Sequence, residues 1–286
     1  MARRPRRSTS PSRAASRAAQ PLTGTALVET LLGGWRALSR LDVDGFAILR
    51  SRGVTRRGNS VVPIEPPTDP AALAAALDRI DALVGAAGEQ PTYRLFDVEG
   101  LDHGPVAAAL EARGAAAGEP TLVLQRPLDG IRTAPDARAS IAVGAPPADW
   151  LEASWRLAPR PEEGARETFR DLMAGTPALY LSLWEDSPSA DGPPGTPDPG
   201  ALAVGRAALV PHRRRTIAVL DQIAVDPARR REVLGRAVVD SLLALAAVQG
   251  ADLALLEVDG GNTAARGLYR AAGFAPAGEY RYVAGG

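Results

Sequence analysis

The segment of residues 228–243, ARRREVLGRAVVDSLL, has the composition of a phosphate-binding helix start. An arginine cluster precedes an apolar pattern of helical spacing, and the unpaired amides and positive dipole end of a helix N-terminus bind anions. Arg230, Arg231 and Arg236 would add charge-assisted donors, and Gly235 would let the backbone approach a ligand closely. The plainer alternative is a surface helix with a solvated basic start.

A second group of polar side chains follows in the sequence LLEVDGGNTAARGLYRAAGF. Glu257 ends an apolar strand pattern, Asn262 begins a helical pattern, and Tyr269 comes seven residues later. Because seven residues make about two helical turns, we expect Asn262 and Tyr269 on the same side of the helix. Each residue alone has a structural explanation, as a sheet-edge carboxylate, an N-cap or a packing aromatic. All three together, after an arginine-rich helix start, indicate a functional site.

The elements that must position these residues occur in the same order in both halves of the chain, which indicates an internal duplication and a mixed α/β fold. In the first half we expect helices at 25–40, 69–88 and 105–115, and strands at 46–50, 59–64, 92–98 and 121–128. In the second half we expect helices at 149–157, 162–174, 228–243 and 262–273, and strands at 139–145, 178–185, 201–210, 216–225, 251–258 and 279–283.

This pattern divides the chain into a disordered basic tail at 1–22, a first domain at 23–128 and a second at 129–286. Residues 187–200 are rich in Pro, Gly and Asp, which predicts a flexible hairpin loop. The two halves differ between strand and helix. The first has the acidic, proline-rich PIEPPTDPAAL, and the second has DPARRREVLGRA, so only the second can hold a phosphate.

The composition excludes several classes of protein. The net charge is 0, with 33 basic and 33 acidic residues, which argues against a general nucleic-acid binder. There is no Cys, the two His residues are far apart, and no apolar run is long enough for a membrane span, so we expect no metal site and no membrane partner. All basic residues are Arg, which is typical of a GC-rich bacterial genome, and we expect a cytoplasmic protein. Asn occurs only at Asn59 and Asn262, so each is expected to have a specific role.

With these motifs the chain resembles the GNAT N-acetyltransferases, which use acetyl-coenzyme A (acetyl-CoA). The cofactor loop of that family, Arg/Gln-x-x-Gly-x-Gly/Ala, falls on Arg230-Arg231-Glu232-Val233-Leu234-Gly235, and Val233 stands where the first glycine is expected. The strand and turn IAVDP and the block LEV–N–A–LYRAAGF also match. The resemblance covers 140–286, and the first half is similar to a degenerate copy of the same fold, as in tandem members. We expect Val233 to tolerate the helical backbone of a first turn.

The resemblance implies an acetyl-CoA-dependent transfer to a primary amine through a tetrahedral intermediate, without a metal. Glu257 would be the base, with Asp221 as the alternative, which we expect to share a strand face with Val219, Ile223 and Val225. Tyr269 would protonate the leaving thiolate. The resemblance also implies a set of residues in contact with acetyl-CoA: Ile223, Ala224, Val225, Arg230, Arg231, Glu232, Val233, Leu234, Gly235, Arg236, Ala237, Asn262 and Tyr269.

The acceptor stays open between a small molecule and a peptide, and the oligomeric state between monomer and homodimer. A first-half group of arginines could meet an acidic substrate, or could be a solvated turn: Arg50, Arg52, Arg56 and Arg57. Two alternatives to an enzyme remain, a catalytically inactive acyl-CoA-binding regulatory protein and an interaction scaffold. The departure at Val233 favours the first, and the retention of Glu257, Asn262 and Tyr269 argues against the second.

Overall fold

The computed structural model describes residues 20–162, 164–185, 200–229 and 233–285. Residues 187–199 of the predicted loop at 187–200 and residues 1–19 of the predicted basic tail therefore lie outside the described residues. At the end of that predicted tail Leu22 is buried, and its amide donates to Oε1 of Gln125 at 3.1 Å. The packed part of the chain thus begins before the predicted boundary at residue 23.

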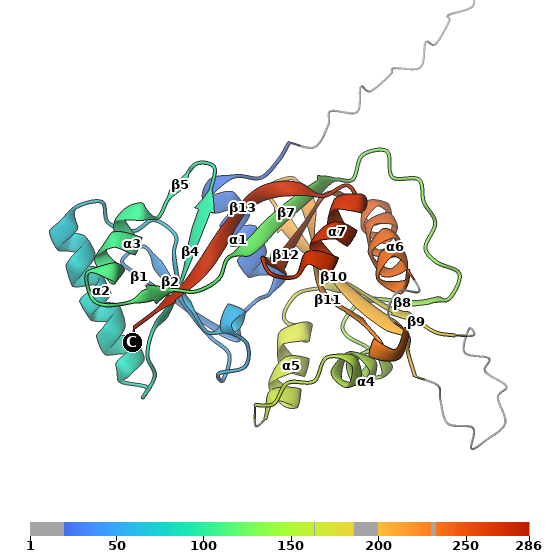
Figure 1. Cartoon of the computed structure of the whole chain (residues 1–286), viewed down its shortest axis with the longest axis horizontal. Helices are drawn as coiled ribbons and strands as arrows, with labels where there is room; N and C mark the ends of the chain where they lie inside the picture. Colours follow the sequence, from blue (N-terminus) through green and yellow to red (C-terminus); the bar gives the residue numbers. More distant parts are fainter. Residues whose placement is uncertain (1–19, 163, 186–199, 230–232, 286) are drawn as a thin grey trace, which may run out of the picture.

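The first half of the chain contributes four longer strands and three helices, with short strands and a 3-10 turn between them (Figure 1). Its elements are α1 (Gly24–Gly34), β1 (Ser39–Val43), β2 (Phe46–Arg50), η1 (Arg56–Gly58), β3 (Val61–Pro63), α2 (Pro70–Gly85), β4 (Thr92–Val98), β5 (Leu101–Asp102), α3 (Gly104–Glu111), β6 (Ala116–Ala117) and β7 (Thr121–Pro127).

The second half repeats the sequence of strand, helix, strand, helix and strand. Its elements are β8 (Ala139–Gly144), α4 (Ala148–Leu157), α5 (Ala165–Ala174), β9 (Ala178–Leu183), β10 (Ala203–His212), β11 (Arg215–Val225), η2 (Pro227–Arg229), α6 (Leu234–Val248), β12 (Ala251–Asp259), α7 (Thr263–Ala271) and β13 (Ala275–Ala284).

One mixed sheet joins both halves in the order β1-β2-β3-β4-β13-β7-β12-β11-β10-β9-β8. Within each half the strands follow one another in the same order, and β3 with β4 and β11 with β12 form the parallel pairs. The final strand of each half is exchanged. β7 pairs with β12 of the second half, and β13 pairs with β4 of the first, so the strands cross the boundary that the sequence pattern suggests.

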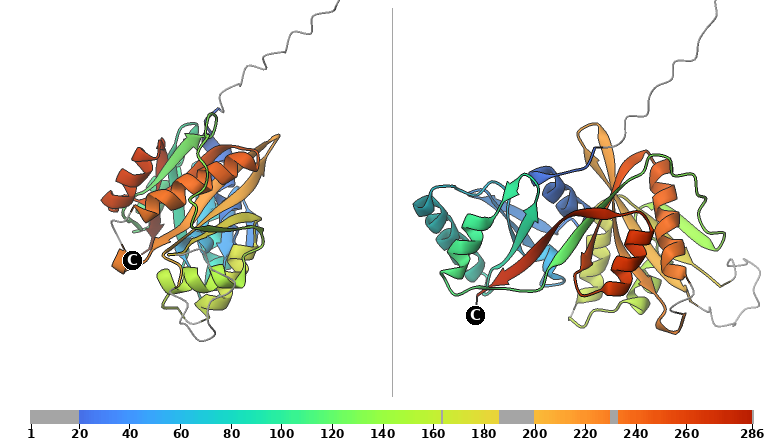
Figure 2. Two further views of the ribbon diagram at one scale, coloured as in Figure 1. Left: turned by 90° about the vertical axis from the view of Figure 1, so that its right-hand side faces the viewer. Right: turned by 45° about the horizontal axis from the view of Figure 1, so that its top comes forward.

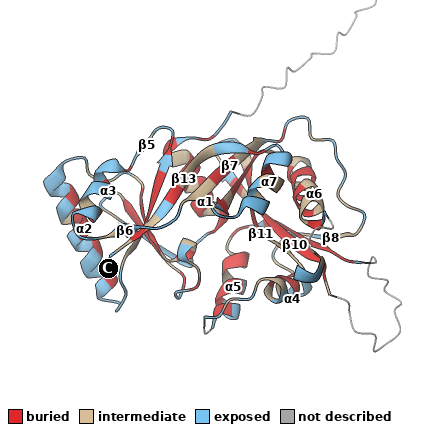
Figure 3. Ribbon diagram, viewed as in Figure 1, coloured by how far each residue is buried: buried red, intermediate tan, exposed pale blue. Residues whose placement is uncertain are grey.

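Helices cover both faces of the sheet (Figure 2). On one face α2 and α3 pack on the first half, and α6 and α7 pack on the second. On the other face α1, α4 and α5 form a core that reaches across both halves, from Ala47 and Phe96 to Leu253. Figure 3 shows the buried residues along the sheet and the inner helix faces, with exposed residues on the outer side of α2. Any site between the strands therefore has one helix layer on each side.

Local signals explain most helix limits. Asp69 caps α2 by accepting the amide of Ala72 at 2.8 Å, Pro70 occupies the first helical turn, and the apolar residues between Leu73 and Val84 recur at helical spacing. The first predicted helix is shorter than expected. It ends at Gly34, and the next residues form β1, because that segment pairs as an edge strand with β2.

None of the helices in the described part of the chain combines the length and apolarity that a membrane span requires. Among the described residues, no group of three or more Asp, Glu and His side chains lies where it could hold a metal ion.

Candidate functional site

The strands β11 and β12 separate in the middle of the second half. Their parallel ladder ends at the pair Leu220 and Leu256, although both strands continue beyond it. On its other edge β11 has a bulge, because Arg206 pairs with Asp221 whereas Val204 pairs with Ala224. One extra residue is therefore inserted at the point where the strands part, and bulges of this kind redirect backbone groups and side chains.

The bulge changes which side chains share a face. Val219 and Asp221 lie on the face that packs against α1, whereas Ile223 and Val225 pack with the core beneath α6. The expectation that all four share one face is therefore wrong. The physical reason is the extra residue at Gln222, whose positive φ of 52° breaks the alternation of the strand.

The start of α6 departs from a regular helical turn. Val233 is the N-cap and has φ 54° and ψ 11°, which is left-handed, and it is 75% exposed. The expectation that Val233 takes a helical conformation is therefore wrong. A β-branched residue is strained in this conformation, which glycine adopts readily. Val233, which stands where the family motif has glycine, thus adopts the left-handed backbone conformation that is typical of glycine.

The residues after Val233 pack within the chain. Leu234 is buried, and a Cβ on Gly235 would lie 3.2 Å from Cδ1 of Leu268 and 3.7 Å from Cγ2 of Val225. Gly235 therefore allows close packing of α6 on α7 and β11. Nε of Arg236 donates to Oδ2 of Asp240 at 2.6 Å and Nη1 to the carbonyl of Ala271 at 3.0 Å. Arg230, Arg231 and Glu232 lie outside the described residues, and Ala237 is half-buried.

Glu257 lies beyond the point where the strands part, on the face toward α1, and joins the two halves. Its side chain is 3% exposed, and Oε2 accepts from Nη1 of Arg57 at 3.0 Å. Oε1 forms an ion pair with Arg94, a side chain of β4 that is 1% exposed. Both guanidinium groups come from the first half of the chain. The predicted base is thus a buried carboxylate with two cationic partners.

Aromatic rings hold both arginines in place. Cζ of Arg94 lies 3.9 Å from the ring centre of Tyr280, and Cζ of Arg57 lies 4.6 Å from that of Trp35. Asn59 shapes the loop that carries Arg57. Its Oδ1 accepts the amides of residues 51 and 53, and its Nδ2 donates to the carbonyls of residues 54 and 55. The specific role expected for this rare asparagine is therefore structural.

Asp221, the alternative base, is fully enclosed. Its Oδ2 accepts from Nη1 of Arg206 at 2.7 Å, and both side chains are at most 1% exposed. Burial raises the pKa of the Asp221 carboxyl, and the charge of Arg206 opposes that shift. Arg206 also donates to the carbonyls of Gly34 and Thr176, so the pair ties α1 and the start of β9 to the sheet.

Tyr269 and Asn262 differ in their surroundings. Tyr269 is 8% exposed and packs edge-on against Phe274 in the core beneath α6 and α7. Burial raises the pKa of its hydroxyl to about 12, with a smaller opposing effect from Arg57. Asn262 is exposed and caps α7, since its Oδ1 accepts the amide of Ala265 at 3.0 Å.

The first-half arginine group divides among different partners. Arg50 pairs with Glu89 and Arg52 with Asp171, both away from Glu257. Arg56 instead stacks on Tyr282, with Cζ 4.9 Å from the ring centre. Of these four arginines, Arg56 and Arg57 line the pocket of about 240 Å³ that opens beside Glu257, and Arg50 and Arg52 do not.

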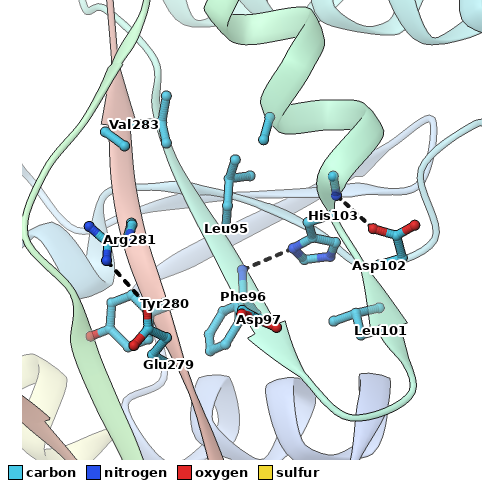
Figure 4. A pocket seen from close by; sticks show the side chains of 13 residues that line it. Leu95, Phe96, Asp97, Leu101, Asp102, His103, Glu279, Tyr280, Arg281 and Val283 are labelled. Atoms are coloured by element: carbon cyan, nitrogen blue, oxygen red, sulfur yellow. Dashed lines mark hydrogen bonds and ion pairs between the residues drawn. The ribbon is translucent and has the colours of Figure 1, made fainter.

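The first half has its own pair of diverging strands, β3 and β4, and His103, which is bonded to Phe96 of β4 (Figure 4), fills the gap between them. β3 and β4 pair only at Val61 and Tyr93, and beyond that pair Nδ1 of His103 accepts the amide of Phe96 at 3.0 Å. The backbone of Pro63 also acts on the imidazole, and Nε2 is buried without a hydrogen-bond partner in the described structure. Burial lowers the pKa of His103 to about 4, so the imidazole is neutral at pH 7. The first half therefore has a side chain where the second half has an opening.

Arg94 and Arg206 belong to the site but were not among the residues predicted from the sequence. A signal was available, because each arginine lies inside a strand pattern with apolar or small residues on both sides, YRLF in the first half and VGRAAL in the second. A charged side chain between core residues needs a buried partner. What the sequence could not indicate was that the partner of Arg94 would be Glu257, in the other half.

Comparison with known proteins decides the family. A family model described as "Probable histone acetyltransferase Rv0428c C-terminal" matches residues 26–283. The chain belongs to this family. No curated protein matches it.

Solved structures of GNAT proteins have the same fold. A GCN5-related N-acetyltransferase from Kribbella flavida superposes with a TM-score of 0.63 at 19% identity, covering 91% of this chain and 93% of that one. A tandem GNAT protein from the clavulanic acid biosynthesis pathway, without AcCoA, has a TM-score of 0.59 at 16% identity, covering 79% and 74%. A GCN5-related N-acetyltransferase from Sphaerobacter thermophilus has a TM-score of 0.58 at 16% identity, covering 84% and 75%.

These findings confirm the expected fold class, a mixed α/β fold of two tandem GNAT-like units, and the resemblance to this superfamily. Family membership also confirms the prediction that the chain is an acetyltransferase.

Proposed function

We propose that this acetyltransferase transfers the acetyl group of acetyl-CoA to a primary amine, and that it binds acetyl-CoA in the second half only. The observation that supports this most directly is the separation of β11 and β12 beyond Leu220 and Leu256. Strand edges freed in this way leave backbone groups of Ile223, Ala224 and Val225 available to a ligand. The helix α6 starts nearby, since a Cβ on Gly235 would lie 3.7 Å from Cγ2 of Val225.

The residues of the second half fit acetyl-CoA. The left-handed backbone at Val233 is the shape that a glycine would give the loop, so the amides of Val233, Leu234 and Gly235 can turn toward a pyrophosphate. Arg230 and Arg231, which precede this helix in the sequence, would add positive charge for the pyrophosphate. Asn262 would approach the coenzyme from α7, and Arg236 would contribute by fixing α6 against α7.

For the chemistry we propose that the amine approaches from the α1 face and acetyl-CoA from the α6 face. The nitrogen bonds to the thioester carbon, the carbon–sulfur bond breaks, and the amine proton passes to Glu257 directly or through water. A backbone amide near Ala224 would stabilise the oxyanion. Tyr269, whose hydroxyl keeps its proton because of burial, would donate it to the departing thiolate.

Asp221 remains the alternative base. Burial raises the pKa of its carboxyl, which favours this role, whereas the ion pair with Arg206 opposes it. The alternative function is a catalytically inactive acyl-CoA-binding regulatory protein, which the strained Val233 and the clamped Glu257 favour. We also propose that the protein is a cytoplasmic monomer or homodimer without nucleic-acid or membrane partners.

Calorimetric titration with acetyl-CoA and CoA, followed by a thiol-release assay over a library of amines, tests this function. Binding with turnover supports the enzyme. Binding without turnover of any amine supports the regulatory protein, and the absence of binding would refute both.

A further inference from the structure

We infer that the acceptor amine carries an anionic group, a carboxylate or a phosphate, and that Arg56 and Arg57 bind it in the pocket beside Glu257. This inference rests on the proposed function and deepens it, because it names the chemical class of the acceptor.

The pocket lies next to the predicted base and has the size of a small acceptor. Its volume of about 240 Å³ corresponds to roughly eight water molecules of about 30 Å³ each. Arg56 and Arg57 of η1, Thr121 of β7 and Tyr282 of β13 line it together with Glu257. An amine held by Glu257 would therefore have two guanidinium groups within the same pocket.

The charges around Glu257 are not balanced. Asp221 is already neutralised by Arg206. Among the described residues, four other guanidinium groups gather on this side of the sheet, those of Arg56, Arg57, Arg94 and Arg160, and three carboxylates accompany them, those of Glu257, Asp259 and Glu162. The first carboxylate, Glu257, is shared by Arg57 and Arg94. The second, Asp259, accepts the amide of Gly261 at 2.8 Å and so shapes the turn before α7. The unbalanced positive charge favours an anionic ligand.

Arg56 is the clearest candidate for binding that anion. It has no carboxylate within ion-pair distance in the described part of the chain, and its guanidinium stacks on Tyr282. A stacked guanidinium keeps its edge donors free, and their fork matches a carboxylate or phosphate. Its neighbours Arg50 and Arg52, by contrast, have acidic partners of their own.

Arg160, in the loop after α4, adds to the positive potential. Its Cζ lies 4.5 Å from the ring centre of Phe169, and its Nη1 is buried without a hydrogen-bond partner in the described structure. Burial lowers the pKa of Arg160, and the charge of Arg57 adds to that shift, whereas the charges of Glu162 and Asp221 oppose it. Like charges held together are stabilised when an anion enters between them.

This potential would act on the acceptor in two ways. It would repel a lysine-rich peptide, whose flanking charges are positive. It would also lower the pKa of the bound amine and so raise the fraction of the neutral nucleophile, provided that an anion on the same molecule holds it there.

The test compares amines that differ only in the anion. Each pair is assayed for kcat/KM by thiol release: an amino acid against its carboxamide for the carboxylate arm, and O-phosphoethanolamine against ethanolamine for the phosphate arm. A lysine-rich peptide is the third arm. We expect at least a tenfold preference for the anionic member of one pair, which identifies its anion, and weak activity with the peptide.

The variant Arg56→Gln should abolish that preference by raising KM for the anionic amine at least tenfold, with little effect on its neutral partner. Arg50→Gln, on the same segment but paired with Glu89, is the matched control and should keep the preference. An equal or better kcat/KM for neutral amines or the peptide, or a preference unchanged in Arg56→Gln, would overturn the inference.

A binding measurement separates this inference from the proposed function. Calorimetric titration with an N-acetylated amino acid and its N-acetylated carboxamide needs no turnover, and titration with acetyl-CoA is run on the same sample. Selective binding of the anionic product without acetyl-CoA binding would support the anion site and refute the acetyltransferase function. Acetyl-CoA binding and turnover without anion selectivity would support the acetyltransferase function and refute the anion site.

Discussion

Arg57 and Glu257 are 200 residues apart in the chain, and their Nη1 and Oε2 atoms lie 3.0 Å apart. With Arg94, this contact makes the predicted base of the second half dependent on side chains of the first. The half that has lost its own opening between strands therefore still supplies part of the site.

The first prediction concerns this buried cluster. Glu257→Gln should abolish activity and also lower the free energy of unfolding by about 3–5 kcal/mol, because Arg94 loses its counter-charge while it stays buried. The double variant Arg94→Met/Glu257→Gln removes that unpaired charge and should regain much of the stability but no activity. Denaturant unfolding of both variants checks this. A single variant as stable as the parent would show that Arg94 is neutralised by another group.

The second prediction concerns Tyr269. If its hydroxyl protonates the leaving thiolate, Tyr269→Phe should lower kcat by roughly 10²–10⁴-fold, because only the acid is lost and the ring still packs against Phe274. Acetyl-CoA affinity, measured by calorimetry, should change little. Turnover at the parental rate would rule out the acid role.

The third prediction concerns the strained start of α6. Val233→Gly should raise the free energy of unfolding by up to about 1 kcal/mol. Glycine removes the strain of a left-handed conformation, roughly 1–2 kcal/mol, but it also increases the conformational entropy of the unfolded chain, which offsets part of that gain. It should also tighten acetyl-CoA binding. The matched control is Val248→Gly, the same change at an exposed helical position of α6, which should be slightly destabilising. A lower Tm for Val233→Gly would contradict the strain.

The fourth prediction concerns His103 and acid stability. Because its pKa in the folded protein is about 4, below the ordinary 6.5, the unfolded chain binds the proton more tightly. Stability should be constant above pH 6.5 with respect to this group, fall by about 3 kcal/mol between pH 6.5 and 4, and level off below. His103→Gln should flatten that part of the pH profile, whereas His212→Gln should not. Parallel profiles for parent and His103→Gln would refute this.

The fifth prediction concerns stoichiometry. One acetyl-CoA should bind per chain, since His103 fills the gap between β3 and β4 and the loop PIEPPTDP contains prolines that lack amide donors. Calorimetric titration gives the number directly. A value near two would mean that the first half also binds the coenzyme.

The fold was largely predictable because its signals are local. Apolar periodicity marked the strand 92–98 and the helix that begins beside Asp69, and turn residues marked their ends. The bulge at Gln222 was not predictable, since nothing in the sequence IAVLDQIAV, residues 217–225, marks an extra residue there. Only the pairing with β10 shows the extra residue.

The candidate site was predictable only in its local parts. Glu257 at a strand end, Asn262 as a cap and the helix start near Gly235 depend on neighbours in sequence. The partners Arg57 and Arg94 depend on how the two halves meet. That arrangement follows from tertiary pairing, which no window of the sequence contains.

The exchange of β7 and β13 has a consequence for how the chain is made. During synthesis the first half emerges well before the strand that completes its sheet, Ala275–Ala284, because the rest of the second half lies between them in the chain. Until then the edge of β4 lacks its neighbour, and Tyr280, which stacks on Arg94, is absent. The two halves therefore cannot mature one after the other, and a truncated chain that ends before β13 would leave both halves incomplete.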